Sequence, residues 1–357
     1  MKFLHDTIQN LLDKAVSSGD EIGCQVAVFA NGKLIVDAVA GTIDRERKHH
    51  VNSHTLFPVF SAGKGIATTA FLRLVERGLI HPDQKVREIW PEFACNGKEE
   101  TTVRHILRHR SGVCIRTPYD FIEQIADWDI MCKRVAAAKP VFPPGSATRY
   151  QTINYTWLLC ELAQRVTGKP FAQIVNEEVF VPAGMNDMFF GVPDSERSRI
   201  TEAIRGSNLP TAPDPLPCWD YSLETIMNNR VIQQACLPGF NCMTTAIDLA
   251  KHYSLLLDSE KNNRLLKRET IREACKMTLA PDDPKPEPSE NWTTFGFGYK
   301  ASRPDADAVG QEFGHGGYGG SIGIASQKNN LAYGFTCNLM NGGAQMRQTL
   351  SELFESI

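Results

Sequence analysis

The sequence predicts an α+β fold in which one antiparallel sheet, flanked by terminal helices, is joined to a large helical lobe. Three observations support this. The first 60 residues turn β-rich after an opening helix, residues 61–289 have mainly helical patterns, and strands return towards the end. We therefore predict a discontinuous α/β sheet domain (1–60 and 290–357) and a mainly helical domain (61–289). An active site is expected in the cleft between them, where ligands commonly bind.

The first elements are predicted to be a helix and a β-hairpin. Residues 5–18 carry apolar side chains at helical spacing. Two β-rich runs follow at 22–30 and 34–40, joined across Asn31-Gly32. Asn-Gly is a strong hairpin signal because both turn residues must adopt positive φ.

The middle of the chain shows helical periodicity at 65–78, 155–166 and 246–257. The acidic, proline-rich stretch 281–288 predicts a solvated linker before the strands return.

The last elements are predicted to be strands at 293–300, 321–325 and 331–337, followed by a helix at 343–357. With the opening hairpin, these strands complete the antiparallel sheet that the terminal helices cover.

The composition is that of an ordinary globular protein. The 357 residues are 42% hydrophobic and 22% charged, enough to bury a core without disulfides or metals. Lys and Arg number 38 against 41 Asp and Glu, a net charge of −3, so we expect neither a nucleic-acid nor a membrane partner.

The chain is predicted to be cytoplasmic. It has no apolar run long enough for a membrane helix, and Asp6 interrupts the N-terminal apolar stretch, which argues against a secretory signal. The ten cysteines form no Cys-x-x-Cys pair and are expected to be reduced thiols.

Ser61-Ala62-Gly63-Lys64 is the only Ser-x-x-Lys sequence in the chain, and it lies where the β-rich start gives way to a helix. Residues three apart share a helix face, so the Lys64 amine can reach the Ser61 hydroxyl. A hydroxyl is a poor nucleophile until a base takes its proton, and a lysine can be that base where burial favours its neutral form. The alternative is that Ser61 is a helix N-cap and Lys64 a surface lysine.

Two further segments carry candidate chemistry. Tyr150 lies on a turn before the helix predicted at 155–166, where it could shuttle a proton or be a surface aromatic. The segment 313–321 contains five glycines, which would let a substrate approach the backbone. N–H groups of a strand edge there could hold an oxyanion, although a glycine-rich loop leading into an edge strand remains the alternative.

Two other patterns are interpreted as incidental. Gly319-Gly320-Ser321-Ile322-Gly323 matches a nucleophile elbow, yet no histidine follows Ser321, as that catalytic order requires. His105 and His109 are spaced like zinc ligands, but Ile106 stands where a zinc protease needs Glu, so we interpret both histidines as structural.

The segments that carry Ser61 and Lys64, Tyr150, and the glycines of 313–321 follow one another in an order that resembles the serine β-lactamase and penicillin-binding protein superfamily. The closer resemblance is to its esterase branch, the family VIII carboxylesterases. Those proteins combine Ser-x-x-Lys, a tyrosine motif roughly ninety residues later and a Lys/His/Trp-x-Gly strand near the end. Here these are Ser61/Lys64, Tyr150 and His315-Gly316-Gly317, and the stretches 106–113, 181–185 and 244–250 also look familial.

The resemblance implies a β-lactamase/transpeptidase-like fold and an acyl-enzyme hydrolase that needs no metal or cofactor. Ser61 would attack the carbonyl of a small-molecule ester, while Lys64 and Tyr150 would move protons as general base and acid. Backbone N–H groups of Ser61 and Tyr318 would form the oxyanion hole. The remaining substrate-binding or oxyanion positions are Thr152, His315, Gly316 and Gly317.

Two departures from the family pattern bear on the substrate. Gln151-Thr152 follows Tyr150 where β-lactam-recognising members usually have x-Asn, and His315 stands where many have Lys. Both weaken features specific to β-lactams, so we expect an esterase with weak β-lactam hydrolysis at most. An acyltransferase, a D-amino-peptidase, a catalytically silent binding or scaffold protein, and a homo-oligomer all stay open.

Overall fold

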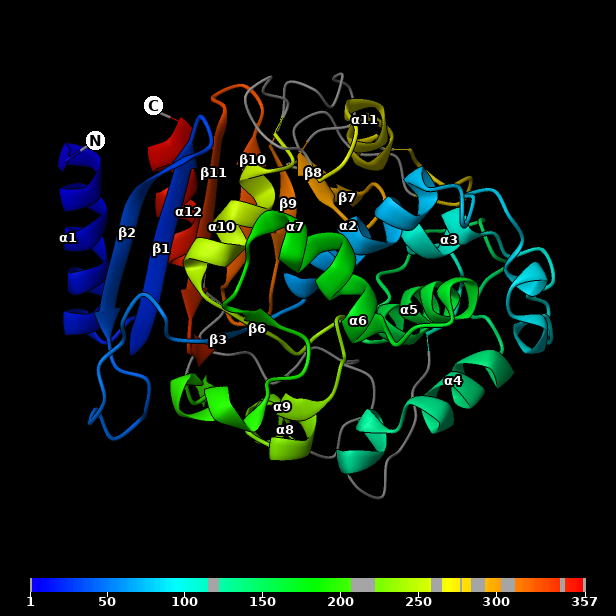
Figure 1. Cartoon of the computed structure of the whole chain (residues 1–357), viewed down its shortest axis with the longest axis horizontal. Helices are drawn as coiled ribbons and strands as arrows, with labels where there is room; N and C mark the ends of the chain where they lie inside the picture. The colour runs from blue at the N-terminus through cyan, green and yellow to red at the C-terminus, as the bar shows by residue number, and fades with distance from the viewer. Residues whose placement is uncertain are drawn as a thin grey trace.

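The computed structural model describes residues 2–114, 122–206, 222–257, 265–276, 278–283, 293–302, 312–340 and 344–355. Its main sheet has seven antiparallel strands in the order β2-β1-β11-β10-β9-β8-β7 (Figure 1). Their bounds are β1 Gly23–Ala30, β2 Lys33–Gly41, β7 Thr293–Phe295, β8 Lys300–Ser302, β9 Glu312–Gly316, β10 Ile322–Ser326 and β11 Leu331–Cys337. Strands from both ends of the chain thus share one sheet, and the α+β fold class is confirmed.

Helices cover both faces of this sheet: α1 (Lys2–Ser18) and α12 (Ala344–Glu355) on one, α10 (Ala246–Ser254) on the other (Figure 1). Ile8 and Leu350 pack with Val26 of β1 in one apolar cluster. The next residue, Ala27, packs with Ala250 of α10. Successive strand side chains point to opposite faces, which is why β1 can be apolar throughout.

The rest of the chain forms a mainly helical lobe beside α10. One apolar core runs through this lobe and reaches the inner face of the sheet at Phe313 and Ala332. Its helices are α2 Gly63–Glu76, α3 Val103–Leu107, α4 Trp128–Ala137, α5 Asn154–Thr167, α6 Phe171–Val175, α7 Val181–Ala183, α8 Leu223–Met227, α9 Arg230–Gln234 and α11 Arg268–Cys275. The small sheets are β3 (Phe57–Phe60) with β6 (Cys242–Thr244) and β4 (Met188–Phe189), and β5 (Ile204–Arg205) with β12 (Leu339–Met340).

The predicted hairpin is confirmed. Asn31 and Gly32 connect β1 to β2 with φ of 51° and 73°, the positive values that the Asn-Gly signal requires. The domain boundaries at residues 60 and 290 stay a prediction.

The outer edge of β2 is covered by side chains of α1. Gln9 donates from Nε2 to the Val39 carbonyl at 2.9 Å, and His5 donates from Nε2 to the Asp37 carbonyl at 3.1 Å. Helix α1 therefore supplies donors to a strand that has a strand neighbour on one side only.

Two predictions about the last strands were wrong. The strand expected at 293–300 is two short strands, β7 and β8, because Gly298 at φ 66° turns the chain between them. The alternative of a glycine-rich loop leading into an edge strand was also wrong, because β9 lies inside the sheet between β8 and β10. Its ladder with β8 ends at Gly314, while that with β10 continues to Gly316.

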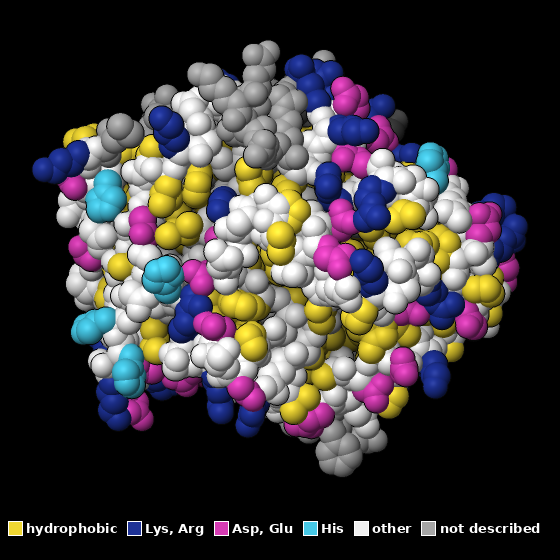
Figure 2. Space-filling model, in the orientation of Figure 1, with side chains coloured by type: hydrophobic (Ala, Val, Ile, Leu, Met, Phe, Trp, Pro, Cys, Tyr) yellow, Lys and Arg dark blue, Asp and Glu magenta, His cyan; other side chains and the backbone are white. Residues whose placement is uncertain are grey.

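The surface is mixed in charge. Figure 2 shows Lys and Arg interspersed with Asp and Glu over the face in view. Some form ion pairs, as Arg104 does with Asp83 and Glu273, at 2.6 Å each. Within the described ranges, no helix combines the length and apolar character needed to cross a membrane.

Candidate active site

Ser61 lies at the junction of β3 and α2, on a strained turn. The preceding Phe60 has φ 47°, which is uncommon for a bulky side chain and occurs where surrounding structure enforces it. Ala62 N donates to Val59 O, and Lys64 N donates to Ser61 O, both at 3.0 Å, so helical turns begin at once. The N-cap of α2 is Ala62, which makes the N-cap interpretation of Ser61 wrong.

Lys64 is fully buried and faces Ser61. Its Nζ donates to Ser61 Oγ at 3.0 Å and to the carbonyl of Gly239 at 2.5 Å. The surface-lysine alternative is therefore wrong. The amine is thus removed from water and lies within hydrogen-bond reach of the hydroxyl that a general base would deprotonate.

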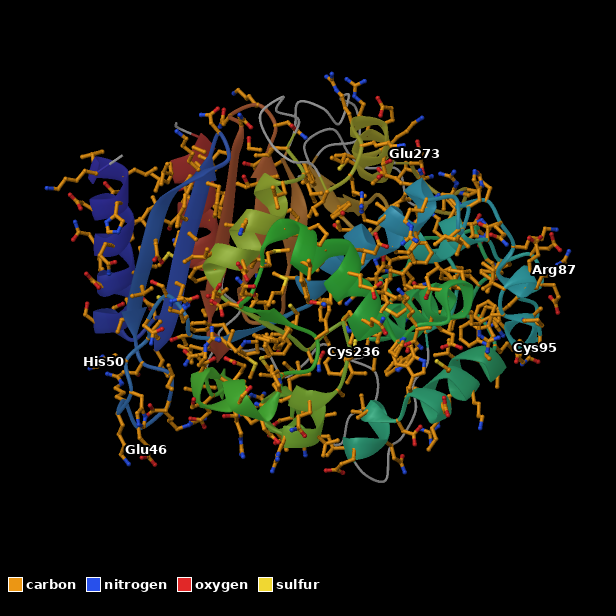
Figure 3. The ribbon with its side chains drawn as sticks, in the orientation of Figure 1. Glu46, His50, Arg87, Cys95, Cys236 and Glu273 are labelled. Carbon is orange, nitrogen blue, oxygen red and sulfur yellow. The ribbon has the colours of Figure 1, made fainter. Side chains whose placement is uncertain are left out.

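The sequence analysis missed Gly239, which lies 175 residues from Lys64. Its N–H donates to Thr156 Oγ1 at 2.8 Å, and a Cβ there would lie 2.4 Å from that oxygen. Cys236, labelled in Figure 3, lies on the segment that leads to it. Pro238-Gly239 was the only local signal, and it indicates a turn rather than a contact with lysine.

Tyr150 completes the group around Ser61. Its hydroxyl is hydrogen-bonded to the Ser61 side chain, and Lys64 Nζ lies 5.0 Å from the centre of its ring. Burial raises the pKa of Tyr150 above its usual value, and the bond to Ser61 offsets this only in part. The tyrosine is thus a neutral phenol at physiological pH, able to donate a proton.

The third motif approaches the same junction from β9. A Cβ on Gly317 would lie only 2.0 Å from Val59 O, so this backbone touches the chain just before Ser61. The Tyr318 ring packs edge-on against Phe60, 5.8 Å between centroids. Gly317 and Tyr318 thus lie against the two residues that precede Ser61.

The remaining two predicted side chains, His315 and Thr152, are buried and half-buried. His315 is 1% exposed, its Nδ1 lies 2.7 Å from Gly316 O, and its ring centre lies 6.1 Å from that of Tyr150. Thr152 is half-buried, next to the buried Gln151, whose amide donates to Ser111 Oγ. His315 therefore lies beside Tyr150 and offers little surface to a ligand.

Ser321 and His105, from the two incidental patterns, have structural roles. Ser321 is 1% exposed and accepts a hydrogen bond from Cys337 N at 3.2 Å, so the nucleophile-elbow pattern does not present a free hydroxyl. His105 serves in the capping box of α3 with Thr102. In the part of the chain that the structure describes, His, Cys, Asp and Glu form no group of three or more that could hold a metal ion.

The profile of the Beta-lactamase family matches residues 8–353. The chain belongs to this family. Similar relatives are the esterase/beta-lactamase LipL of Mycobacterium tuberculosis (28% identical, covering 88% of this chain and 77% of LipL) and the esterase EstB of Burkholderia gladioli (30% identical, covering 53% and 52%). A crystal structure of a family VIII carboxylesterase aligns with TM-score 0.82 and 28% identity over 95% of this chain and 92% of the other.

The family membership confirms three predictions: the resemblance itself, the β-lactamase-like fold, and an enzyme as the class of protein. The chain is a hydrolase of the β-lactamase fold. Its reaction and its substrate are the next question.

Proposed function

We propose that this β-lactamase-family enzyme hydrolyses carboxylic esters through an acyl-enzyme on Ser61. The observation that carries the proposal is the 3.0 Å contact between the buried Lys64 Nζ and Ser61 Oγ. A nucleophile within hydrogen-bond reach of a desolvated amine is the arrangement that activates a hydroxyl.

In the proposed reaction, Ser61 Oγ bonds to the carbonyl carbon while its proton passes to Lys64. Tyr150 then gives its proton to the departing alkoxide and takes in return the proton held by Lys64, the ester C–O bond breaks, and the acyl group stays on Ser61. Water attacks the acyl-enzyme with Lys64 and Tyr150 again moving its protons, which returns the carboxylic acid and free Ser61. N–H groups of Ser61 and Tyr318 are the proposed oxyanion donors.

The substrate we favour is a small neutral ester. Thr152 stands where β-lactam-recognising members usually have Asn. The buried His315 stands where many of them have the fixed cation of a Lys. EstB is named as an esterase and LipL as an esterase/beta-lactamase, which supports an ester substrate. Acyl transfer to an alcohol, weak β-lactam or D-amino-peptide hydrolysis, and a silent scaffold are the alternatives, and a cytoplasmic location stays a prediction.

The experiment combines a substrate panel with covalent labelling. p-Nitrophenyl esters of increasing chain length are compared with a chromogenic cephalosporin, and a fluorophosphonate probe is mapped by mass spectrometry. We expect faster ester than cephalosporin turnover, an adduct on the Ser61 peptide and not the Ser321 peptide, and loss of both signals in Ser61→Ala. A labelled but ester-inactive protein would favour acyl transfer or amide substrates, whereas an unlabelled one would favour the silent scaffold.

A further inference from the structure

We propose that His109 is a positioning residue that holds Tyr150 at its working distance from Ser61 and Lys64. The inference rests on the proposed role of Tyr150 and adds a residue from the familial stretch 106–113, outside the three catalytic motifs. His109 is fully buried and has φ 56°, in the left-handed region that Asn, Asp and His adopt more readily than other side chains.

The residues on either side of Tyr150 are both hydrogen-bonded to this one histidine. Arg149 N donates to the backbone carbonyl of His109 at 2.9 Å, and Gln151 N donates to its ring Nδ1 at 3.1 Å. Because Nδ1 accepts, the ring proton lies on Nε2 and the imidazole is neutral. The turn that carries Tyr150 is thus fixed on both sides of the tyrosine.

The ring of His109 also lies between two tyrosines. Its centre is 5.0 Å from that of Tyr150 and 4.9 Å from that of Tyr155. The Tyr155 hydroxyl bonds to Thr68 Oγ1 at 2.7 Å, and Thr68 is one turn after Lys64 on α2. A continuous contact path therefore links the helix that carries Lys64 to the ring of Tyr150.

This path has little freedom to shift. A Cβ on Gly298 would lie 2.0 Å from Thr68 Oγ1 and 2.4 Å from the Tyr155 hydroxyl, so the backbone at Gly298 closes the space behind both groups. Close packing of this kind transmits a displacement rather than absorbing it. Loss of the His109 contacts should therefore move Tyr150 relative to Lys64.

The test separates the hydrogen-bond acceptor of His109 from its ring. His109→Asn places Oδ1 where Nδ1 was and tolerates positive φ, whereas His109→Phe keeps a ring and removes the acceptor. A misplacement of about 1 Å can cost about a hundredfold in rate, so we expect kcat for p-nitrophenyl butyrate to fall by about that factor in His109→Phe. We expect KM to stay within about threefold, because binding is not the property that is lost.

Rescue and labelling complete the test. His109→Asn should retain kcat within about tenfold of the wild type, and the fluorophosphonate labelling rate of Ser61 should follow kcat in both variants. Tyr155→Phe removes only the bond to Thr68 and should lower kcat with KM unchanged, which keeps the inference testable if His109→Phe does not fold. His252→Asn is the matched control, since His252 is equally buried and bonds through Nε2 to Thr69 at 2.8 Å outside the path.

The inference is overturned if both His109→Phe and Tyr155→Phe keep the kcat of the wild type, or if His109→Asn loses as much kcat as His109→Phe. It is also overturned if His252→Asn lowers kcat as much as His109→Phe does when the two variants lose the same melting temperature. Activity remaining in Ser61→Ala would instead overturn the proposed function. The two failures are therefore distinguishable.

Discussion

A methyl group at Gly317 would collide with the backbone that leads into Ser61. The added Cβ would lie 2.0 Å from Val59 O, and ordinary contacts begin at 3.4 Å, so the two segments must separate by about 1.4 Å. The two nearest atoms, the carbonyl oxygen and carbonyl carbon of Val59, belong to the backbone, which cannot rotate away as a side chain can. Gly317→Ala should therefore displace Tyr318 and its N–H from Ser61.

The expected effect is large on catalysis and moderate on stability. A shift of about 1 Å can cost about a hundredfold in rate, so we predict a fall in kcat of about that size or more. Overpacking of this kind typically costs about 1–3 kcal/mol of folding free energy. Steady-state kinetics with p-nitrophenyl butyrate and urea unfolding of the same samples measure the two effects.

Gly316→Ala is the comparison for this prediction. There the added Cβ would meet the end of the Arg347 side chain at 2.9 Å, which can move, so we expect a smaller loss of kcat than in Gly317→Ala. Gly317→Ala with kcat within about threefold of the wild type would refute the idea that this contact fixes the site.

Three further predictions concern single side chains. Lys64→Arg should lose at least about a hundredfold in kcat despite its charge, since a guanidinium cannot accept the Ser61 proton, and an active variant would reduce Lys64 to an electrostatic role. Tyr150→Phe should lose a similar factor in kcat. Because the pKa of Tyr150 is raised, ionisation of this tyrosine should not lower the kcat of the wild type up to about pH 10. A fall in kcat below that pH which disappears in Tyr150→Phe would contradict this. Burial holds the pKa of His252 at about 3, against about 6.5 when unfolded, so the unfolded chain binds the proton first as pH falls. This group should then remove about 2 kcal/mol of stability between pH 7.5 and pH 5, and urea unfolding of His252→Asn should show a correspondingly smaller pH dependence.

Local signals were sufficient for the parts of the site that are close in sequence. The i, i+3 spacing of Ser61 and Lys64 placed their side chains together because both lie on the first turns of one helix. Asn31-Gly32 set the first hairpin for a similar reason, since its φ values permit one tight turn.

The remaining contacts depend on packing between distant segments. Gly239 offers only a carbonyl, which every residue has, so its contact with Lys64 leaves no distinctive pattern in the sequence. The interior place of β9 depends on its pairing with β8 and β10, which the strand's own residues do not encode. His109 was interpreted as structural because Ile106 does not fit a zinc-protease pattern, and its contacts with positions 149–155 form only after folding.

The hydrogen-bond donors that α1 supplies to β2 affect whether copies of this chain can associate through the edge of the sheet. An open strand edge is a template on which the strand of another molecule can be added, and repeated addition leads to aggregates. Gln9 and His5 occupy the carbonyls of Val39 and Asp37 that such an added strand would need. Helix α1 thus ends the sheet at β2, and without its side chains these carbonyls would be open to a strand of another molecule.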